Sequence, residues 1–580
     1  MPQTDKNAPT ALTGAQAIAA VIAEQEHPLV LGMPGGYTMN IWDALYDQRD
    51  RVETRLVRQE SIATVMAEAT GRLTGRPAFV IAQGAWVLGN AGVGIMEAHL
   101  GASPVVILID ATDGGAYSHL GPYQAGHGGY GAYDLSAAMT AISKRTFVAR
   151  DAAQALQLTQ LAIKHATTGE PGPVVVIFER RALVQRLDPR TQPPTYIERS
   201  YAVPSTPPAA ADAIFRAAEL IRASARPVII AGNGVRLSQA ETQLASFAEA
   251  TGIPVSTTPA GKGVFDERGD LAAGVIGPFG HETGNATVGQ ADLILAVGTK
   301  LGATDTLNEH PELIDVGRQR LVQIDLEPLN ASWTFPADHV IIGDAADALG
   351  RLRAALEGFV VDGRTRVAEV RVRHPYFDRP SVSEASDLSA RDVVAELSRL
   401  SPERTVLTCD AGENRLFVLR EFASKAGGTV LQPNGGGGMG YAIPAAMAAA
   451  MAKPEHRAIA VCGDGGFSMS LHSLISAVEL QLTLTVVVLN NAVLGWVYNG
   501  QRGRYIASEL VSFDYDRIAA AIGAYAVAVA TLDEAREEIA AALDRPGVSV
   551  IVADVRKDDR YQDVMSPLNR DDVYAVPENR

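Results

Sequence analysis

Two groups of polar residues that could bind a metal ion and a phosphate stand directly after strand-like runs. Gly463-Asp464-Gly465-Gly466 follows the apolar run 458–462, and Asn490-Asn491 closes a second one that begins at residue 484. Glycine lets backbone N–H groups approach a phosphate, while carboxylate and amide oxygens suit a divalent cation. A helix-like segment, Met469 to Leu480, joins the two runs. The order strand, helix, strand predicts that both groups lie at the carboxyl edge of a parallel sheet, where they would bind Mg²⁺ and a diphosphate.

Two further features are less specific when taken alone. Glu60 begins an alanine-rich, helix-like run, where its alternative role is to complement the helix dipole. The glycine run 435–440 allows close approach of a ligand to the backbone and contains one bulky side chain, Met439, whose alternative role is core filling.

A glycine-rich loop at 114–130 carries His119, Gln124 and His127. Long loops of this kind often carry binding residues on a rigid scaffold, and a surface loop with incidental polar residues is the alternative. The two histidines stand eight positions apart with no further nearby ligand, so they do not predict a zinc site.

The elements that must position these residues alternate between strand-like and helix-like runs. This alternation predicts an α/β protein with mainly parallel sheets. A chain of 580 residues is too long for one hydrophobic core, and we expect three consecutive α/β domains followed by a tail. Their ranges are 1–185, 203–356 and 388–557, with the tail, a possible lid over the site, at 558–580. The proline-rich stretch 186–209 and the charged stretch 362–387 are interpreted as linkers.

Composition excludes several classes of partner. The net charge is −16 and there is no block of basic residues, so we expect no nucleic-acid partner. The apolar runs are too short or too interrupted to span a membrane, and residues 1–10 lack the features of a signal peptide. Both cysteines, Cys409 and Cys462, lie in apolar runs and are expected to be buried thiols. These features together predict a cytoplasmic protein.

In combination, these motifs resemble the thiamine-diphosphate-dependent enzymes of the acetolactate synthase-like (2-oxo acid decarboxylase/carboligase) superfamily. Gly32-Met33-Pro34-Gly35-Gly36 is similar to the family's Pro-Gly-Gly turn, and Arg58-Gln59-Glu60 stands where the family has Arg-His-Glu. The run 251–263 resembles the middle domain, and Gly463-Asp464-Gly465 with Asn490-Asn491 is the most specific match. The resemblance covers nearly the whole chain and implies an N-terminal pyrimidine-binding, a middle and a C-terminal diphosphate-binding domain.

The resemblance also implies a role for each matching residue. Asp464 and Asn491 would bind Mg²⁺ through their side chains, with the carbonyl of Val493 as a third protein ligand. Met439 would hold thiamine diphosphate in a bent conformation, and Glu60 of another subunit would hydrogen-bond its pyrimidine ring. Further cofactor contacts would come from Gly412, Asn414, Gly438, Gly465 and Gly466. A site shared in this way implies at least a homodimer, and the family favours a homotetramer.

The substrate pocket departs from that of true acetolactate synthases. Tyr37 follows Pro-Gly-Gly where a small residue is usual, Gly-Pro-Gly-Ala-Thr-Asn is replaced by residues 83–90, and Trp496 takes the place of a methionine. Gln124 matches a glutamine that reaches the reacting carbonyl in the family. We therefore expect the catalytic groups to be Glu60 with pocket residues from the following set: Gln124, His119, His127 and Tyr37.

These departures favour a specialised lyase or carboligase that makes or breaks a C–C bond next to the carbonyl of a 2-oxo acid, aldehyde or hydroxyketone. The alternatives are hydrolysis of a dione, cleavage of a 2-hydroxyacyl thioester, and acetolactate synthesis itself. A non-catalytic binding relative is disfavoured because Glu60, Asp464 and Asn491 are all present. In the middle domain, 299–303 replaces the arginine-containing run of flavin-binding members, so FAD or ADP is not favoured as a second cofactor.

Overall fold

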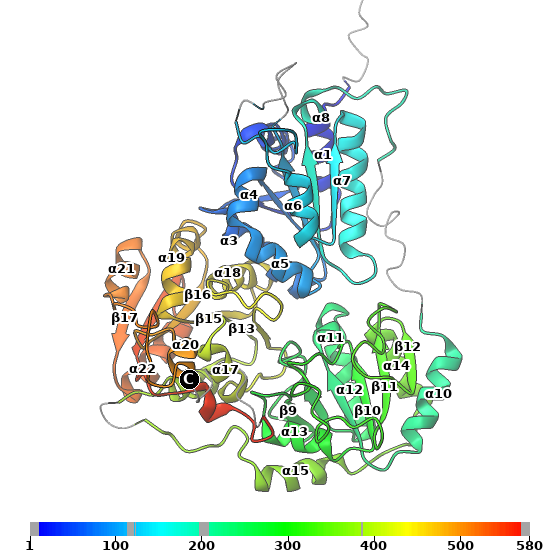
Figure 1. Cartoon of the computed structure of the whole chain (residues 1–580), viewed down its shortest axis with the longest axis vertical. Helices are drawn as coiled ribbons and strands as arrows, with labels where there is room; N and C mark the ends of the chain where they lie inside the picture. Colours follow the sequence, from blue (N-terminus) through cyan, green and yellow to red (C-terminus); the bar gives the residue numbers. More distant parts are fainter. Residues whose placement is uncertain (1–10, 113–120, 122, 196–207, 384–386, 570–580) are drawn as a thin grey trace, which may run out of the picture. The chain divides into compact units, whose positions relative to one another are not determined.

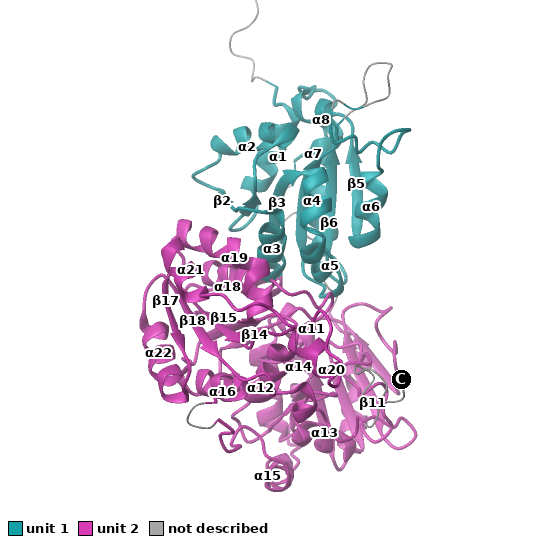
Figure 2. Ribbon diagram, turned by 60° about the vertical axis from the view of Figure 1, so that its left-hand side comes forward, with its two compact units in different colours: residues 1–71, 76–205 teal, residues 72–75, 206–580 magenta. Residues whose placement is uncertain are grey.

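The computed structural model describes residues 11–112, 121, 123–195, 208–383 and 387–569. These residues fall into two compact units, which have separate colours in Figure 2. Unit 1 comprises residues 1–71 and 76–205, and unit 2 comprises residues 72–75 and 206–580.

Unit 1 contains one six-stranded sheet in the order β2-β1-β3-β4-β6-β5, and every strand pair in it is parallel. The strands are β1 (Leu29–Gly32), β2 (Glu53–Leu56), β3 (Ala78–Gln83), β4 (Val105–Asp110), β5 (Arg145–Ala149) and β6 (Pro173–Phe178). From β1, the chain adds β2 on one side, and β3 and the later strands lie on the other side of β1. In folds of this kind, ligands bind beside the carboxyl ends of the strands at this switch in strand order, here β1 and β3.

The helices of unit 1 cover a sheet whose central strands are buried on both faces. They are α1 (Gly14–Ala23), α2 (Met39–Tyr46), α3 (Glu60–Thr74), α4 (Gly84–Asn90), α5 (Gly92–Leu100), α6 (Leu135–Ile142), α7 (Ala152–Thr167) and α8 (Arg180–Val184), with a 3₁₀ turn η1 (Gly36–Thr38). Helices α1, α7 and α8 contact one another (Figure 1), and α1, α2 and α7 form one hydrophobic core with alternate residues of β3 and β4. The uninterrupted apolar runs of these strands follow from burial on both faces.

Unit 2 contains two further six-stranded parallel sheets. The first has the order β12-β11-β10-β7-β8-β9, with β7 (Pro227–Ala231), β8 (Val255–Thr257), β9 (Ala272–Val275), β10 (Leu293–Val297), β11 (Arg320–Asp325) and β12 (His339–Ile342). The second has the order β14-β13-β15-β16-β18-β17, with β13 (Thr405–Cys409), β14 (Thr429–Leu431), β15 (Arg457–Gly463), β16 (Leu484–Asn490), β17 (Tyr525–Val529) and β18 (Val548–Asp554). Three parallel sheets with interleaved helices confirm the predicted fold class.

The helices of unit 2 follow the same alternation. Those of the first sheet are α10 (Ala211–Arg222), α11 (Asn233–Leu237), α12 (Glu241–Thr251), α13 (Glu282–Gly289) and α14 (Ala345–Ala355), and α15 (Gly363–Arg373) follows them. Those of the second are α16 (Ala390–Leu400), α17 (Glu413–Glu421), α18 (Ala442–Ala452), α19 (Asp464–Glu479), α20 (Gly495–Gly500), α21 (Tyr515–Ile522) and α22 (Leu532–Asp544). No helix among the described residues combines the length and apolarity needed to cross a membrane.

Two elements differ from the sequence-based expectation. The charged stretch 362–387 is not linker throughout, because residues 363–373 form α15, whose first turn is capped by the side chain of Asp362 and whose Val367 and Val370 are buried. The helix expected from Met469 begins at Asp464, so the Gly-Asp-Gly motif forms the first helical turn. Glycine disfavours helix, and packing at this turn overrides that preference. The two thiols are free and buried, as predicted.

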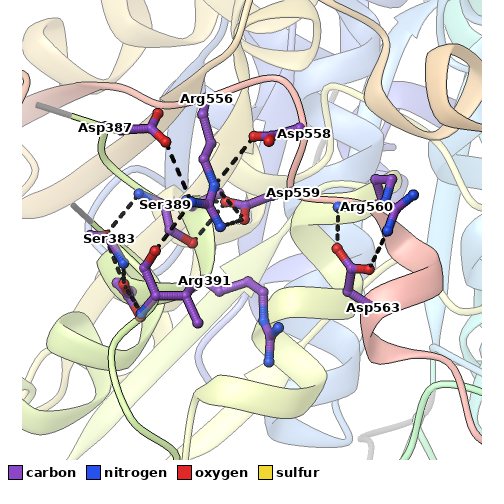
Figure 3. Close-up of polar contacts among 12 residues, drawn as sticks. Ser383, Asp387, Ser389, Arg391, Arg556, Asp558, Asp559, Arg560 and Asp563 are labelled. Carbon is purple, nitrogen blue, oxygen red and sulfur yellow. Dashed lines mark hydrogen bonds and ion pairs between the residues drawn. The ribbon is translucent and has the colours of Figure 1, made fainter.

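We call the second sheet of unit 2 the third sheet, because it is the third in chain order. The described part of the C-terminal segment is fixed to the domain that contains this sheet, as Figure 3 shows. Arg556 forms ion pairs with Asp387 (3.4 Å) and Asp559 (2.9 Å), and Asp559 also accepts a hydrogen bond from the Ser389 hydroxyl (2.8 Å). Beyond this network, Tyr561 in η2 (Tyr561–Val564) is fully buried. The lid expected at 558–580 stays a prediction, and residues 570–580 lie outside the described ranges.

Candidate active site

Three neighbouring strands of the third sheet end at one pocket. Gly412 and Asn414 follow β13, Asp464 and Gly465 follow β15, and Asn491 follows β16. These residues line a pocket that encloses about 670 Å³ of empty space, part of it open solvent, which is within the usual range for small-molecule sites. The lining also includes the following residues named from the sequence: Met439, Gly466 and Val493. The structure therefore brings the predicted metal and diphosphate residues together.

Asp464 has the features of a cation ligand. Its side chain is 1% exposed, and its Oδ2 atom is buried without a hydrogen-bond partner. Burial raises the pKa of Asp464 to about 6, although nearby backbone N–H groups act in the opposite direction. A buried carboxylate oxygen without a partner is costly unless a proton or cation satisfies it.

Asn491 and Val493 supply neutral oxygens beside Asp464. The backbone N–H of Val493 donates to Oδ1 of Asn491 at 3.1 Å, which orients the amide. The described residues contain no group of three or more His, Cys, Asp and Glu side chains that could hold a metal. A cation here would therefore combine one carboxylate with an amide oxygen and a backbone carbonyl, and such hard oxygen ligands suit Mg²⁺ when phosphate and water complete the shell.

Asp410 organises the glycine loop and was missed by the sequence reasoning. It is 1% exposed and accepts hydrogen bonds from the backbone N–H groups of Gly440 (3.0 Å) and Ala442 (2.6 Å). A Cβ atom on Gly466 would lie 2.0 Å from Oδ2 of Asp410, so only glycine fits there. The carboxyl group thus holds the loop that presents Met439 to the pocket. Its sequence signal was an acidic residue directly after a buried strand.

Met439 and Gly438 lie on the loop that Asp410 anchors. Met439 is 37% exposed and lines the pocket, so it is not core filler. The carbonyl of Gly438 accepts a hydrogen bond from the backbone of Ala411 at 3.4 Å, which joins this loop to the segment after β13. Gly412 is the N-cap of α17 and has φ +103°, a conformation that glycine adopts readily and other residues rarely do.

Glu413 is a second acid in the pocket wall, and sequence reasoning missed it too. Its Oε1 accepts hydrogen bonds from Asn499 and from the backbone of Tyr561, both at 2.9 Å, while Oε2 is buried without a partner. Burial raises the pKa of Glu413 to about 7. Gly495 makes room for this carboxyl group, since a Cβ there would lie 2.1 Å from Oε2.

In unit 1, Glu60 is the first residue of α3 and is 4% exposed. The side-chain amide of Asn90 donates to its Oε2 atom at 2.9 Å. The Thr64 hydroxyl lies 3.2 Å from the carbonyl of Glu60 and 3.2 Å from that of Ala91, where α4 meets α5. The carboxyl group is therefore held between two helical segments of its own unit.

Among the pocket residues predicted in unit 1, Tyr37 lies next to a buried acid, Asp110. Tyr37 is half-buried, and its backbone N–H donates to Oδ2 of Asp110 at 2.5 Å. Asp110 also accepts from the backbone of Gly84 at 3.1 Å, and burial raises its pKa. This acid fixes the ends of β1 and β3 relative to β4, a role that its place at a strand end could have suggested.

The remaining candidates lie on the loop that follows β4. Gln124 is half-buried and has φ +49°, a conformation that residues other than glycine rarely adopt. His127 is exposed, and its Nδ1 accepts from Gly129 of the same loop at 3.1 Å. His119 lies outside the described residues. The described contact of His127 is thus within its own loop, and the catalytic roles expected of Gln124, His127 and Tyr37 stay predictions.

Three parts of the chain match descriptions of one enzyme family. Residues 12–124 match "Thiamine pyrophosphate enzyme, N-terminal TPP binding domain", residues 214–352 match its "central domain", and residues 410–553 match its "C-terminal TPP binding domain". The chain belongs to the thiamine pyrophosphate enzymes. The first segment contains β1 to β4, the second contains β7 to β12, and the third begins just after β13 and runs into β18, so each falls within the part of the chain that forms one parallel sheet. The family resemblance expected from the motifs is confirmed. Members of this family catalyse lyase or transfer reactions at C–C bonds.

Curated relatives of this thiamine pyrophosphate enzyme extend over most of its length. It is 29% identical over 548 residues to "Probable acetolactate synthase large subunit" of Methanocaldococcus jannaschii, covering 92% of this chain and 90% of the relative. It is 28% identical over 550 residues to "Acetolactate synthase isozyme 3 large subunit" of Escherichia coli, covering 92% of each. The enzyme is therefore acetolactate synthase-like in sequence.

Proposed function

We propose that this enzyme makes or breaks a C–C bond next to a carbonyl group, as a thiamine-diphosphate-dependent lyase or carboligase with Mg²⁺. The observation that carries the proposal is the pocket at the carboxyl edge of the third sheet, whose lining includes Asp464, Asn491 and Met439. Thiamine diphosphate would supply the nucleophilic carbon that protein side chains lack.

The charge of the pocket supports a metal ion. Among the described residues that line it, Glu413 and Asp464 carry carboxyl groups and no side chain is basic. A diphosphate would be repelled by these acids unless a cation lay between them. Asp464, Asn491 and the carbonyl of Val493 would hold that Mg²⁺. The diphosphate would lie against the glycine-rich segments, near Gly412, Asn414, Gly465 and Gly466, with Gly438 and Met439 next to the rest of the cofactor.

Glu60 would hold or move a proton at the pyrimidine ring of the cofactor, and we propose that it does so in the site of a partner subunit. Exposed apolar side chains support an oligomer. On α5, Val93 is 42% and Leu100 58% exposed, and in unit 2 Val511 is 73% and Phe513 59% exposed. Such side chains are typical of interaction surfaces when they cluster. A homodimer is the minimum assembly, and a homotetramer is the proposed one.

The substrate would be a small 2-oxo acid, aldehyde or hydroxyketone. Tyr37 and Gln124, at the carboxyl edge of the unit 1 sheet, are the pocket residues we propose to contact it, with the histidines of the same loop as further candidates. The names of the relatives favour acetolactate synthesis as the second candidate function. Tyr37 opposes it, since an aromatic side chain would occupy space that the family leaves for substrate. We propose no flavin, and visible flavin absorbance in the purified protein would contradict this.

The experiment loads the purified protein with thiamine diphosphate and Mg²⁺ and measures CO₂ release and product over a panel of 2-oxo acids. CO₂ release identifies decarboxylation, whereas cleavage of a dione or hydroxyacyl thioester releases none. Glu60→Gln should lower turnover about 10²–10⁴-fold while the cofactor still binds. Asp464→Ala should abolish Mg²⁺-dependent cofactor binding.

Asp544→Ala is the matched control, because Asp544 is an exposed acid at the end of α22 and does not line the pocket. It should leave cofactor affinity unchanged. Unchanged turnover in Glu60→Gln, or wild-type cofactor affinity in Asp464→Ala, would overturn the proposed roles.

A further inference from the structure

Asn90 contacts the carboxyl group of Glu60 directly. Its Nδ2 atom donates to Oε2 of Glu60 at 2.9 Å, and Glu60 is buried while Asn90 is half-buried. A carboxylate can only accept from an amide, so the contact fixes which end of the Asn90 side chain faces Glu60.

Packing at both ends fixes the segment that carries Asn90. The helix α4 begins at Gly84, where an added Cβ would lie 2.2 Å from the carbonyl oxygen of Asp110. Helix α5, which follows Ala91, packs on α3 through Gly94, where a Cβ would lie 2.4 Å from the Thr64 hydroxyl. Because neither glycine tolerates a side chain, the last residue of α4 has a defined position above the start of α3.

The amide of Asn90 is not used to cap a helix. Ala91 is both the C-cap of α4 and the N-cap of α5, and no side-chain hydrogen bond caps either end. The side chain of Asn90 is thus available for Glu60. Within the described residues, Asn90 is the side-chain donor to the carboxyl group of Glu60. Asn90 thus holds one of the two carboxyl oxygens of Glu60, Oε2.

We propose that Asn90 is a positioning residue for Glu60: it holds Oε2 so that Oε1 points to the pyrimidine nitrogen of the cofactor. This inference rests on the proposed function, and it concerns a residue that does not itself touch substrate or cofactor. A carboxyl group with one oxygen fixed needs no reorientation before proton transfer, and such preorganisation is what supporting hydrogen bonds provide at active sites.

The test uses Asn90→Leu, which keeps the size of the side chain and removes the donor, with Thr64→Val as the matched control. The hydroxyl group of Thr64 also contacts Glu60, but it donates to the backbone carbonyl of Glu60 and not to the carboxyl group. Two quantities are measured on the cofactor-loaded protein without substrate: the rate of hydrogen–deuterium exchange at C2 of bound thiamine diphosphate, and the dissociation constant of the cofactor from tryptophan fluorescence.

Asn90→Leu should slow C2 exchange about 10–100-fold, the size of effect that supporting hydrogen bonds have at other sites. Cofactor affinity should stay close to that of the wild type, since Asn90 does not line the diphosphate pocket. Thr64→Val should change neither quantity. If Asn90→Leu does not fold, Asn90→Ala gives the same test, because it also removes the donor and adds no charge beside Glu60.

If the Asn90 variants exchange at the wild-type rate while Glu60→Gln exchanges slowly, the positioning role of Asn90 is wrong and the proposed role of Glu60 is unaffected. Equal slowing in Thr64→Val would also overturn it, since helix packing rather than the hydrogen bond would then explain the effect. If the wild type and Glu60→Gln exchange equally slowly, the proposed role of Glu60 itself is wrong, so the two failures are distinguishable.

Discussion

At the scale of residues, burial rather than charge pairing governs the acids around the pocket. The pKa values of Asp410 and Asp464 rise to about 6 and that of Glu413 to about 7, in each case chiefly through loss of solvent. Near neutral pH these groups are therefore close to the point at which they bind a proton or a cation. A pocket with this property favours a metal ion as the counter-charge to a diphosphate.

Glu413 should make the stability of the cofactor-free protein depend on pH. Its pKa rises from 4.5 to about 7 on folding, so between these values the folded chain holds a proton that the unfolded chain has lost. The resulting stabilisation is fully present below pH 4.5 and is lost as the pH rises through about 7. The loss should reach at most about 3 kcal/mol.

Thermal unfolding between about pH 5 and 8 measures this effect. The Glu413→Gln protein, which has no group to ionise at this position, should show a flatter decline of Tm with rising pH than the wild type. Parallel curves for the two proteins would mean that Glu413 is already ionised in the fold.

Residues of the candidate site could be predicted where their type and their position after a strand pointed to them, and were missed where only packing places them there. Asp464, Asn491 and Met439 stand in motifs next to strand ends, and the pocket collects all three. Asp410 lies in no motif used in the prediction, and Asn90 ends the stretch 83–90, which was interpreted only as a difference in the substrate pocket. Their roles depend on which backbone or carboxyl group the fold places opposite them, and spacing along the chain does not contain that information.

At the scale of elements, a buried ion pair lies within the segment after β8, and its acid contacts the segment after α17. Nζ of Lys262 lies 2.9 Å and 2.7 Å from the two carboxylate oxygens of Glu267, and the side chains are 0% and 2% exposed. Glu267 also accepts from the backbone of Ser424 at 2.7 Å. The segments that follow β8 and α17 are thus connected through Glu267, whose charge is compensated by Lys262 without access to water.

Lys262→Met should destabilise the protein by about 3–5 kcal/mol, because it leaves the Glu267 carboxylate buried without its cation. The double variant Lys262→Met with Glu267→Gln should lose less than Lys262→Met alone. Arg268→Ala is the control, since Arg268 and Glu403 form an exposed pair whose contribution is small. Denaturant unfolding measures all three, and a loss in Lys262→Met no larger than in Arg268→Ala would contradict the expectation.

The order and type of the elements could be predicted because parallel strands buried on both faces are uninterrupted apolar runs. Where prediction failed, tertiary packing outweighed local preference. Gly465 and Gly466 are poor helix formers, yet α19 begins at Asp464, because Gly466 must lie against Asp410. The charge of residues 363–373 suggested linker, and two buried valines convert the segment into α15.

At the scale of the whole molecule, Glu60 and the diphosphate pocket lie in different compact units of the chain. If the site is shared between subunits, two inactive variants should restore activity when mixed. Glu60→Gln and Asp464→Ala, exchanged in equal amounts, would form heterodimers in half of the assemblies, each with one intact site of two. The mixture should therefore recover about a quarter of wild-type activity.

Activity assays after dissociation and reassociation of the two variants measure this recovery. The control is each variant carried through the same procedure alone. No recovery in mixtures that demonstrably contain heterodimers would mean that Glu60 serves the pocket of its own chain.

The contact between Gly466 and Asp410 also constrains how this enzyme can diverge. Because a Cβ at position 466 would lie 2.0 Å from the carboxyl group, position 466 cannot acquire a side chain while Asp410 keeps its place. A lineage that acquires alanine at position 466 must replace the acid at position 410 by a smaller residue. It then loses the carboxyl group that anchors the loop carrying Met439. Among related sequences, the two positions should therefore covary, and where both have changed, a different contact should hold the loop that carries Met439.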